Sequence, residues 1–207
     1  MSIWAIIPVK QLAQSKSRLA AVLSEAERAR LVLQLLQREL DVLGQAACID
    51  QTVVVSSDAA VLALAQAAGA NVIPEVASEG INRAVQKAVG LAVQEGITAV
   101  LILPVDLPFL QLSDIEQIID HAKTKQVGKT NMVICPDGHG TGTNALCLPP
   151  LFDFAFQYGE QSFQKHIAQA RQHQLIPVVL QIPRLMFDLD TIDDWHTYQR
   201  QVAQLSP

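Results

Sequence analysis

The chain begins with the apolar stretch IWAIIPV at residues 3–9, and three cations follow it closely, namely Lys10, Lys16 and Arg18. An apolar run of this length that ends at charged residues indicates a buried strand. In an open α/β sheet, ligands bind in the crevice outside the carboxyl ends of the strands. The three cations therefore stand where the sheet would meet an anion, and phosphate is the leading candidate.

Helical and apolar patterns alternate along the chain as far as residue 136. A capping box of Ser24 and Glu27, followed by leucines at helical spacing toward Gly44, predicts the first helix. The pattern then predicts strands at 52–56, 70–74, 100–103 and 131–135, helices at 58–69, 82–95 and 113–122, a second capping box of Ser113 and Glu116, and a polar turn at 123–130. Parallel strands need such crossovers, so the order indicates an α/β fold with a mostly parallel sheet covered on both faces.

The pattern loosens after residue 136. It predicts strands at 144–148 and 178–180, a helix at 162–174 and a closing helix at 191–204 that opens with Thr191-x-x-Asp194. The sequence shows no internal repeat, linker or low-complexity segment. A length of 207 residues fits one α/β domain, so residues 1–207 are predicted to form a single domain.

Composition limits the class of protein. Half of the residues are hydrophobic, 17% are charged and the net charge is −5, which describes a globular chain and argues against a general nucleic-acid binder. The three cysteines lack paired spacing, so neither a disulfide framework nor a zinc knuckle is indicated. The first apolar run is interrupted by Pro8 and Lys10 and is too short for a signal peptide or a membrane span. We expect a soluble cytoplasmic protein with no nucleic-acid or membrane partner.

Carboxylates follow two predicted strand ends. Asp106 stands between two prolines after the most apolar strand, and Asp188 and Asp190 alternate so that they point the same way in extended backbone. Alternatively, Asp106 accepts hydrogen bonds in a turn and Asp190 caps the final helix. Mg²⁺ in phosphoryl chemistry is held by one or two carboxylates together with phosphate oxygens. Carboxylates and cations at one sheet edge therefore favour phosphoryl transfer.

A glycine-rich segment, DGHGTGTN at residues 137–144, could let backbone N–H groups approach an anion. It matches neither the Walker A motif nor the G-x-G-x-x-G fingerprint, and it could equally be a turn. His139 has no partner at metal-ligand spacing and is assigned no catalytic role.

Two helix starts carry candidate binding groups. Ser162, which follows Gly159, is a predicted N-cap whose neighbouring N–H groups could also take a phosphate or carboxylate. Asn82, which follows Gly80, could read the edge of a base or simply cap its helix.

Several segments in chain order carry a resemblance to one family. They are Ile7-Pro8-Val9-Lys10, Lys16-Ser17-Arg18-Leu19, Gly80-Ile81-Asn82, Pro104-Val105-Asp106-Leu107-Pro108, Gly140-Thr141-Gly142-Thr143-Asn144-Ala145-Leu146, Gly159 with Ser162-Phe163, and Asp188-Leu189-Asp190. Together they resemble the 2-phospho-L-lactate/phosphoenolpyruvate guanylyltransferases of coenzyme F-420 biosynthesis, in the MobA-like nucleotidyltransferase superfamily.

The resemblance implies a three-layer Rossmann-like nucleotidyltransferase fold and a GTP-dependent enzyme that uses Mg²⁺. Such an enzyme transfers GMP to the phosphate of a small phosphorylated acid and releases pyrophosphate. The implied roles are nucleotide phosphate binding for Lys10, Lys16 and Arg18, metal binding for Asp106 and Asp190 with Asp188 as a further candidate, acid binding for Thr143, Gly159 and Ser162, and a place near guanine or ribose for Gly80 and Asn82.

Two departures bear on the substrate. Related molybdenum-cofactor and sugar nucleotidyltransferases have a glycine-rich loop after the first strand, where this chain has Pro8-Val9-Lys10. Glu160-Gln161 stands where smaller residues are expected, so Glu160 must point away from an anionic substrate or pair with a cation. The acceptor stays open among phosphoenolpyruvate, 2-phospho-L-lactate and 3-phosphoglycerate.

Two other functions remain open from the sequence. One is a nucleotidyltransferase for another acceptor, a sugar phosphate or molybdopterin, and the other is a non-catalytic GTP-binding regulator. A homodimer is expected from the general frequency of such assemblies.

Overall fold

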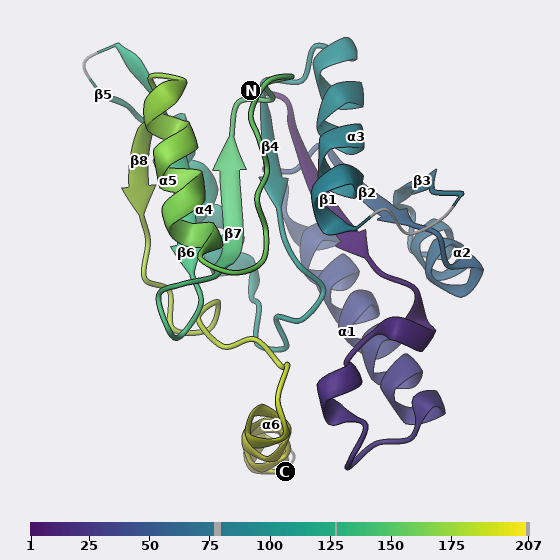
Figure 1. Cartoon of the computed structure of the whole chain (residues 1–207). Coiled ribbons are helices and arrows are strands. Elements are labelled where there is room, and N and C mark those ends of the chain that lie inside the picture. The colour runs from purple at the N-terminus through teal and green to yellow at the C-terminus, as the bar shows by residue number, and fades with distance from the viewer. Residues whose placement is uncertain (77–79, 127, 206–207) are drawn as a thin grey trace.

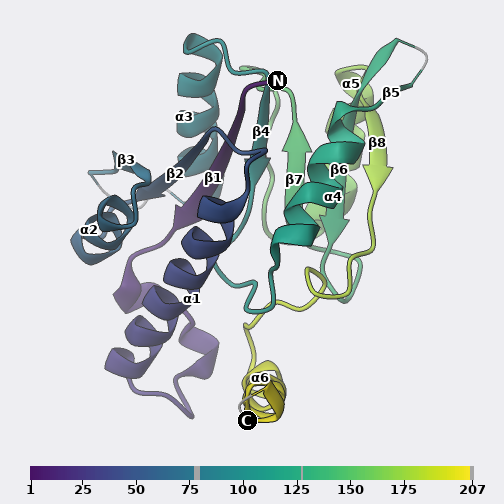
Figure 2. The same cartoon turned by 180° about the vertical axis from the view of Figure 1, so that it is seen from behind.

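A single sheet with helices on both faces organises the chain (Figures 1 and 2). The computed structural model describes residues 1–76, 80–126 and 128–205. The strands are β1 (Ile3–Val9), β2 (Gln51–Ser56), β3 (Asn71–Pro74), β4 (Ala99–Ile102), β5 (Lys125–Gln126), β6 (Lys129–Pro136), β7 (Thr143–Leu148) and β8 (Ile176–Val179). Their order is β3-β2-β1-β4-β7-β6-β5, and β8 pairs with β6.

Strand direction creates one edge at which the chain leaves most strands. Strands β1 to β4 run parallel, β7 runs antiparallel to both β4 and β6, and β8 runs parallel to β6. The carboxyl ends of β1, β2, β3, β4, β6 and β8 therefore meet the amino end of β7, and we call this the site edge. The prediction of a mostly parallel sheet is confirmed. The reversed strand β7 follows β6 through a short loop, which only antiparallel neighbours allow.

The helices form two outer layers. On one face α1 (Glu25–Gln45), α2 (Ala59–Ala67) and α4 (Leu112–Lys123) cover one hydrophobic core, and on the other α3 (Ile81–Gln94) and α5 (Ser162–Gln172) cover a second. Two short 3-10 turns, η1 (Leu12–Gln14) and η2 (Ser17–Leu19), follow β1. The last helix, α6 (Ile192–Leu205), lies beyond the site edge and packs on η2 through a small third cluster (Figure 1). The three-layer prediction is confirmed.

Strand β1 explains why the first apolar run decides the fold. Every residue from Ile3 to Val9 is buried, with alternate side chains in the two cores. A parallel strand with helices on both sides must be apolar on both faces, so it appears in sequence as a continuous run. Pro8 stays within the strand, paired with Val55 of β2.

Several local predictions need correction. The α4 capping box uses Gln111 and Asp114 rather than Ser113 and Glu116. Gln161, not Ser162, is the N-cap of α5. Gly44 lies inside α1, which continues to Gln45.

Other corrections concern strands and caps near the end of the chain. Part of the predicted polar turn at 123–130 is β5 and the start of β6, with residue 127 outside the described chain. Asp188 and Asp190 follow no strand, because residues 180–191 form an irregular connection from β8 to α6. Thr191 and Asp194 cap α6 reciprocally as predicted, with 2.7 Å from the Thr191 N–H to Asp194 Oδ2.

A β-bulge changes which way the start of β7 faces. Cys135 pairs with Ala145, but the next residue, Pro136, pairs with Thr143, so Asn144 is the extra residue. A bulge turns the side chains that follow it. The Thr143 hydroxyl accordingly meets α5 on one face of the sheet, and the Asn144 amide meets the 180–191 connection on the other.

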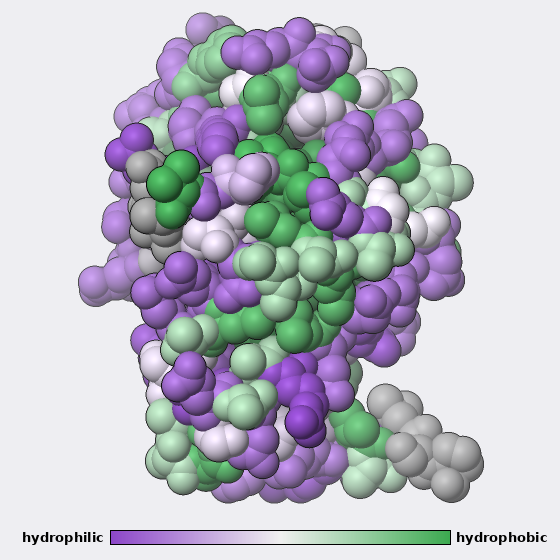
Figure 3. All heavy atoms as spheres, turned by 90° about the vertical axis from the view of Figure 1, so that its right-hand side faces the viewer, coloured by the Kyte–Doolittle hydropathy of each residue, from purple (hydrophilic) through white to green (hydrophobic). Residues whose placement is uncertain are grey.

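The surface is not uniformly polar. Figure 3 shows a hydrophobic band across the middle of the face on the right-hand side of Figure 1, where α2 lies. Helix α2 carries exposed alanines at positions 59, 60 and 63. None of the helices in the described residues is both long and apolar enough to cross a membrane.

Candidate active site

A cavity of about 350 Å³ opens at the site edge and contains most of the charged residues singled out from the sequence. It is lined by Pro8, Val9, Lys10, Gln14, Ser15, Lys16, Ser17, Arg18, Val32, Glu75, Gly80, Ile81, Ala84, Pro104, Val105, Asp106 and Asp190. The structure therefore brings the three cations together with two of the three candidate carboxylates and with Gly80.

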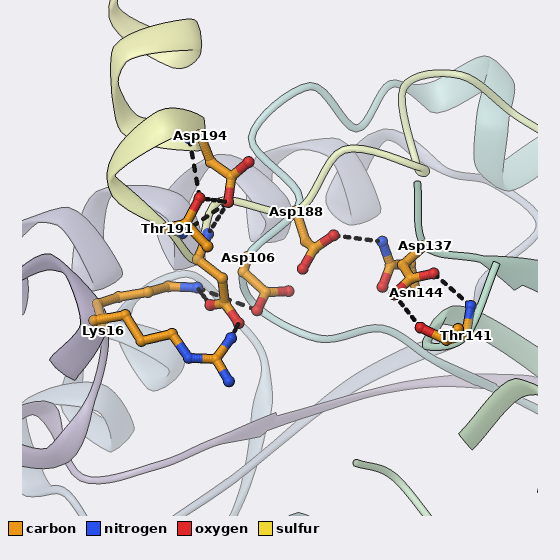
Figure 4. Close-up of polar contacts among 10 residues, drawn as sticks. Lys16, Asp106, Asp137, Thr141, Asn144, Asp188, Thr191 and Asp194 are labelled. Carbon is orange, nitrogen blue, oxygen red and sulfur yellow. Dashed lines mark hydrogen bonds and ion pairs between the residues drawn. The ribbon is translucent and has the colours of Figure 1, made fainter. Parts of the chain in front are cut away.

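Lys16 is the centre of the charged cluster. Its ammonium Nζ lies 3.1 Å from Asp106 Oδ2 and 2.8 Å from Asp190 Oδ1, and its side chain is only 6% exposed (Figure 4). The left-handed backbone of Lys16, with φ of 50°, turns the chain from η1 into η2. Arg18 reaches Asp190 Oδ2 at 3.9 Å but stays 73% exposed. Lys16 is thus a buried bridge, and Arg18 is a cation open to solvent.

The charges of the cluster hold one another in their ionised forms. Burial alone would lower the pKa of Lys16, but Asp106 and Asp190 outweigh burial and raise it above its ordinary value. Burial would raise the pKa of Asp190, but Lys16 and the other nearby cations bring it below its usual range. Both members of the pair are therefore charged at neutral pH.

Asp106 has the features of a metal ligand. It follows β4 between Pro104 and Pro108, and its carbonyl accepts a hydrogen bond from the Leu189 N–H at 3.0 Å. Its Oδ1 is buried at the cavity and has no hydrogen-bond partner among the described residues. A buried orphan oxygen of this kind is destabilising unless a donor or cation meets it. The described residues hold no cluster of three or more His, Cys, Asp or Glu suited to a metal, but Mg²⁺ needs only one or two carboxylates when phosphate and water supply its other ligands.

Asp188 differs from the other two carboxylates. Its Oδ1 accepts a hydrogen bond from Asn144 Nδ2 at 3.3 Å, and its carboxylate points toward Asn144 in Figure 4. Burial, together with the negative charge of Asp106, raises the pKa of Asp188 to about 6. Asp188 therefore lies beside the charged cluster without joining its ion pairs.

The residues implied in acid binding form a second group, away from the lining of the cavity. Ser162 Oγ donates to Thr143 Oγ1 at 3.2 Å, and the Ser162 N–H donates to the Gly159 carbonyl at 3.1 Å. Gly159 has φ of 114°, a conformation that favours glycine. The three residues therefore meet at the start of α5, where β7 begins.

Asn82 is not placed to read a base. Its Nδ2 donates to the Tyr158 carbonyl at 3.3 Å and its Oδ1 accepts from the Tyr158 N–H at 2.6 Å. Gly80, with φ of 90°, is the N-cap instead. The amide of Asn82 thus ties α3 to the segment before Gly159, while Gly80 itself reaches the cavity.

The glycine-rich loop forms a turn in which two of its N–H groups already have partners. The Asp137 carboxylate accepts a hydrogen bond from the Thr141 N–H at 2.8 Å (Figure 4). The Asp137 carbonyl accepts one from the Gly140 N–H at 3.1 Å, so both N–H groups are already used. A Cβ on Gly142 would lie 2.6 Å from Asp137 Oδ2, and one on Gly138 would lie 3.0 Å from the Met186 carbonyl. Gly138 and Gly142 therefore let the loop lie close to the Met186 carbonyl and to the Asp137 carboxylate.

Two contacts fasten the connection that carries Asp188 and Asp190, and sequence reasoning missed both. Asn144 Nδ2 donates to the Leu185 carbonyl at 2.8 Å. Arg184 Nη2 lies 2.6 Å from Oδ1 of the fully buried Asp114, and its Nε donates to the same carboxylate. A pairing across 70 residues leaves no local pattern in the sequence.

Arg184→Ala is expected to lower the free energy of unfolding by about 2–3 kcal/mol, because it leaves the buried Asp114 carboxylate without its cation. The position of Asp190 should be disturbed as well, since the connection that carries it loosens. Urea denaturation measures the first effect, and Arg38→Ala, a change at an exposed position of α1, is the control. Equal stability of the two variants would contradict the stabilising role of the ion pair between Arg184 and Asp114.

His166 is a further residue that sequence reasoning missed. It lies one helical turn after Ser162, at the i+4 spacing that places two side chains on one helix face, which could have pointed to it. Its Nδ1 is 3.0 Å from Thr143 Oγ1 and its Nε2 accepts the Gln157 N–H at 3.1 Å. Burial, and secondarily the charge of Lys165, lower the pKa of His166 to about 4.

The low pKa of His166 predicts acid sensitivity. Between the ordinary pKa near 6.5 and about 4, the unfolded chain binds a proton that the folded chain does not, so stability must fall as the pH falls through this window. The loss saturates below about pH 4 and amounts to about 3 kcal/mol. His166→Gln should flatten the dependence of the melting temperature on pH between 6.5 and 4, whereas His196→Gln, at an exposed position of α6, should leave it as steep as in the wild type.

Comparisons with known proteins identify the family of the chain. The family model described as guanylyl transferase CofC like matches residues 3–197. A phosphoenolpyruvate guanylyltransferase of Rubrobacter xylanophilus is 37% identical over 94% of this chain and 92% of its own length. A 2-phospho-L-lactate guanylyltransferase of Methanothermobacter thermautotrophicus is 33% identical over 94% and 82%.

Solved structures share the fold. A nucleotidyl transferase from Methanothermobacter thermautotrophicus superposes with a TM-score of 0.70 at 13% identity, covering 99% of both chains. CMP:2-keto-3-deoxy-manno-octonic acid synthetase does so with a TM-score of 0.66 at 12% identity, again over 99% of both. The fold is therefore that of Rossmann-like nucleotidyltransferases, and by its sequence the chain belongs to the guanylyl transferase CofC-like family.

Proposed function

We propose that this protein transfers GMP from GTP to the phosphate of a small phosphorylated acid, with release of pyrophosphate, in coenzyme F-420 biosynthesis. The observation that carries the proposal is the convergence of Lys16, Asp106 and Asp190 at one cavity, from segments at the start, middle and end of the chain. The acid is phosphoenolpyruvate, 2-phospho-L-lactate or 3-phosphoglycerate, and the names of the relatives support the first two.

The dimensions of the cavity suit a nucleoside triphosphate. Its lining runs from Glu75, directly after β3, to Asp106, which follows β4. These strands are three places apart in the sheet, and a spacing of about 4.8 Å gives roughly 14 Å between their ends. A nucleotide can thus extend along the site edge with its base near Gly80 and Ile81 and its phosphates near the cations.

The charged side chains divide the work of the reaction. Lys10, Lys16 and Arg18 would hold the triphosphate and stabilise the charge that develops on the departing pyrophosphate, which is the main protein contribution to phosphoryl transfer. Asp106 and Asp190 would hold Mg²⁺, which when bound neutralises charge at the attacked phosphorus. The unpartnered Asp106 Oδ1 supports that role. Lys16 must then leave its bridging position and turn to phosphate.

The acceptor would lie beside Thr143, Gly159 and Ser162. The start of β7 is at the same edge as Asp106, since β7 pairs with β4 and begins where β4 ends. Glu160 is exposed, and the Lys165 ammonium donates to its carbonyl at 2.8 Å. The Lys165 cation therefore lies beside Glu160, where it can offset the negative charge that Glu160 adds near an anionic acid.

Pyrophosphate release tests the proposal. GTP and Mg²⁺ are supplied with each of the three acids in turn, and then with a sugar phosphate or molybdopterin. Release with one acid, and its loss without Mg²⁺, supports guanylyl transfer and identifies the acceptor. Release only with another acceptor favours the broader nucleotidyltransferase function. GTP binding without release under any condition favours a regulator.

The expected homodimer and cytoplasmic location stay predictions. Sedimentation of the purified protein decides the first, and fractionation of the producing cells decides the second.

A further inference from the structure

A buried hydrogen-bond chain stands behind the Thr143 hydroxyl. It begins at the Gln157 N–H, passes through the ring of His166 and ends at Thr143 Oγ1, where Ser162 Oγ also arrives. His166 is fully buried, Ser162 is 1% exposed and Thr143 is 6% exposed. Water therefore has little access to this hydrogen-bond chain.

The direction of each proton in this chain follows from its first member. A backbone N–H can only donate, so Nε2 of His166 must accept from Gln157. A neutral imidazole that accepts at Nε2 carries its proton on Nδ1, so His166 donates to Thr143 Oγ1. Ser162 Oγ donates to the same oxygen at 3.2 Å. With both of these donors, both lone pairs of the Thr143 hydroxyl are in use, and its own hydrogen is available for a further acceptor.

The surroundings keep His166 neutral. The rings of Tyr158 and Phe156 meet the imidazole edge-on, with centroids 4.9 and 6.5 Å away, and Phe154 stacks at 6.2 Å. An apolar box of this kind disfavours the charged imidazolium. The bulge in β7 turns the Thr143 side chain toward these rings. The Thr143 hydroxyl therefore meets a neutral His166, which donates to it through Nδ1.

We propose that His166 is a positioning residue for the phosphorylated acid, because its Nδ1–H fixes the Thr143 hydroxyl as a hydrogen-bond donor to an oxyanion of that acid. The inference rests on the proposed function. Phosphate and carboxylate oxygens only accept hydrogen bonds when ionised, so a hydroxyl held as a donor matches them without having to reorient. Thr143 touches the acid, and His166 acts through Thr143.

Two substitutions at His166 separate its two hydrogen bonds. The amide nitrogen of Asn can take the place of Nδ1, so His166→Asn keeps a donor for Thr143. The longer His166→Gln can keep an acceptor for the Gln157 N–H but offers no donor at the position of Nδ1. We expect His166→Gln to raise KM for the acid about tenfold or more while KM for GTP stays the same, which is the size of one hydrogen bond to a charged group. His166→Asn should recover most of the loss.

A double-mutant cycle with Thr143→Val shows whether His166 acts through the hydroxyl. Thr143→Val alone should raise KM for the acid about ten- to a hundredfold. Adding His166→Gln to Thr143→Val should change it little further, because the hydroxyl is already gone. If the increase in KM for the acid in the double variant equals the product of the two single increases, the inference is overturned. Equal increases in KM for GTP and for the acid would overturn it as well.

The wild-type protein offers a readout that does not depend on the variants folding. Nitrogen-15 NMR of its histidines should show one ring with a protonated Nδ1 and a bare Nε2 that does not titrate between pH 5 and 8. A protonated Nε2 at His166 would overturn the inference. If the wild type releases no pyrophosphate with any acid, the proposed function fails and the inference fails with it. An active wild type with an unaffected His166→Gln variant overturns the inference alone.

Discussion

Asp106→Asn is expected to lower kcat for pyrophosphate release by about a thousandfold, because a neutral amide cannot hold a divalent cation as a carboxylate does. Charge stabilisation by a metal is worth several kcal/mol in such reactions, and each 1.36 kcal/mol is a factor of ten. The amide has almost the shape of the carboxylate, and Asp190 still pairs with Lys16, so the fold should be kept. Steady-state kinetics at saturating GTP and acid measures the loss.

Neighbouring carboxylates serve as comparisons for Asp106. Asp120→Asn, at an exposed position of α4, should retain wild-type turnover. Asp188→Asn should have a much smaller effect than Asp106→Asn, because Asp188 is engaged with Asn144 rather than with the Lys16 ion pairs. An Asp106→Asn protein that keeps normal turnover would remove Asp106 from the metal site, and an equal loss at Asp188 would make it a third ligand.

Lys16→Met is expected to have two opposite effects. Turnover of GTP should fall about a hundredfold or more, because the triphosphate loses a cation that would contact it directly. A more distant cation such as Lys10 cannot replace that contact. Binding of Mn²⁺ without nucleotide should instead become about tenfold tighter. In the wild type the Lys16 ammonium lies between Asp106 and Asp190, so an entering metal has to displace it, and in the variant two neighbouring carboxylates are left with no bridging cation.

Electron paramagnetic resonance of free Mn²⁺ measures the second effect without reference to turnover. Lys129→Met, at an exposed position of β6, is the matched control and should change neither quantity. Reduced turnover with unchanged Mn²⁺ affinity would mean that Lys16 binds phosphate but does not compete with the metal.

Local patterns in the sequence were sufficient for most of the elements. The capping box at Ser24 and the reciprocal cap of Thr191 and Asp194 were both confirmed, because each needs only residues three apart. The cap at Ser113 was wrong because α4 begins at Leu112, before Ser113, and Asp114 accepts a hydrogen bond from the Gln111 N–H while it pairs with Arg184 of a distant segment. Ser162 was misplaced for a related reason, since its hydroxyl is drawn into the fold by Thr143 instead of turning back on its own helix.

The candidate site was predictable as a set of residues but not as an arrangement. Strand ends and the family resemblance together identified Lys16, Arg18, Asp106 and Asp190, and the structure gathers them at one cavity. Sequence could not show that Lys16 bridges both carboxylates, because that contact depends on a left-handed turn at Lys16 itself. Nor could it show that Asp137 accepts hydrogen bonds from the N–H groups of Gly140 and Thr141, because the sequence does not give the conformation of the turn.

The bridge between Lys16 and Asp190 also has a consequence for biosynthesis. Its two ends are 174 residues apart, whereas the last strand, β8, ends at Val179. On the ribosome, every strand that the structure describes is therefore made before Asp190 emerges. A nascent chain that stops short of Asp190 contains every strand that the structure describes but lacks the residue that closes the charged cluster, so the cluster is completed only after those strands have been made.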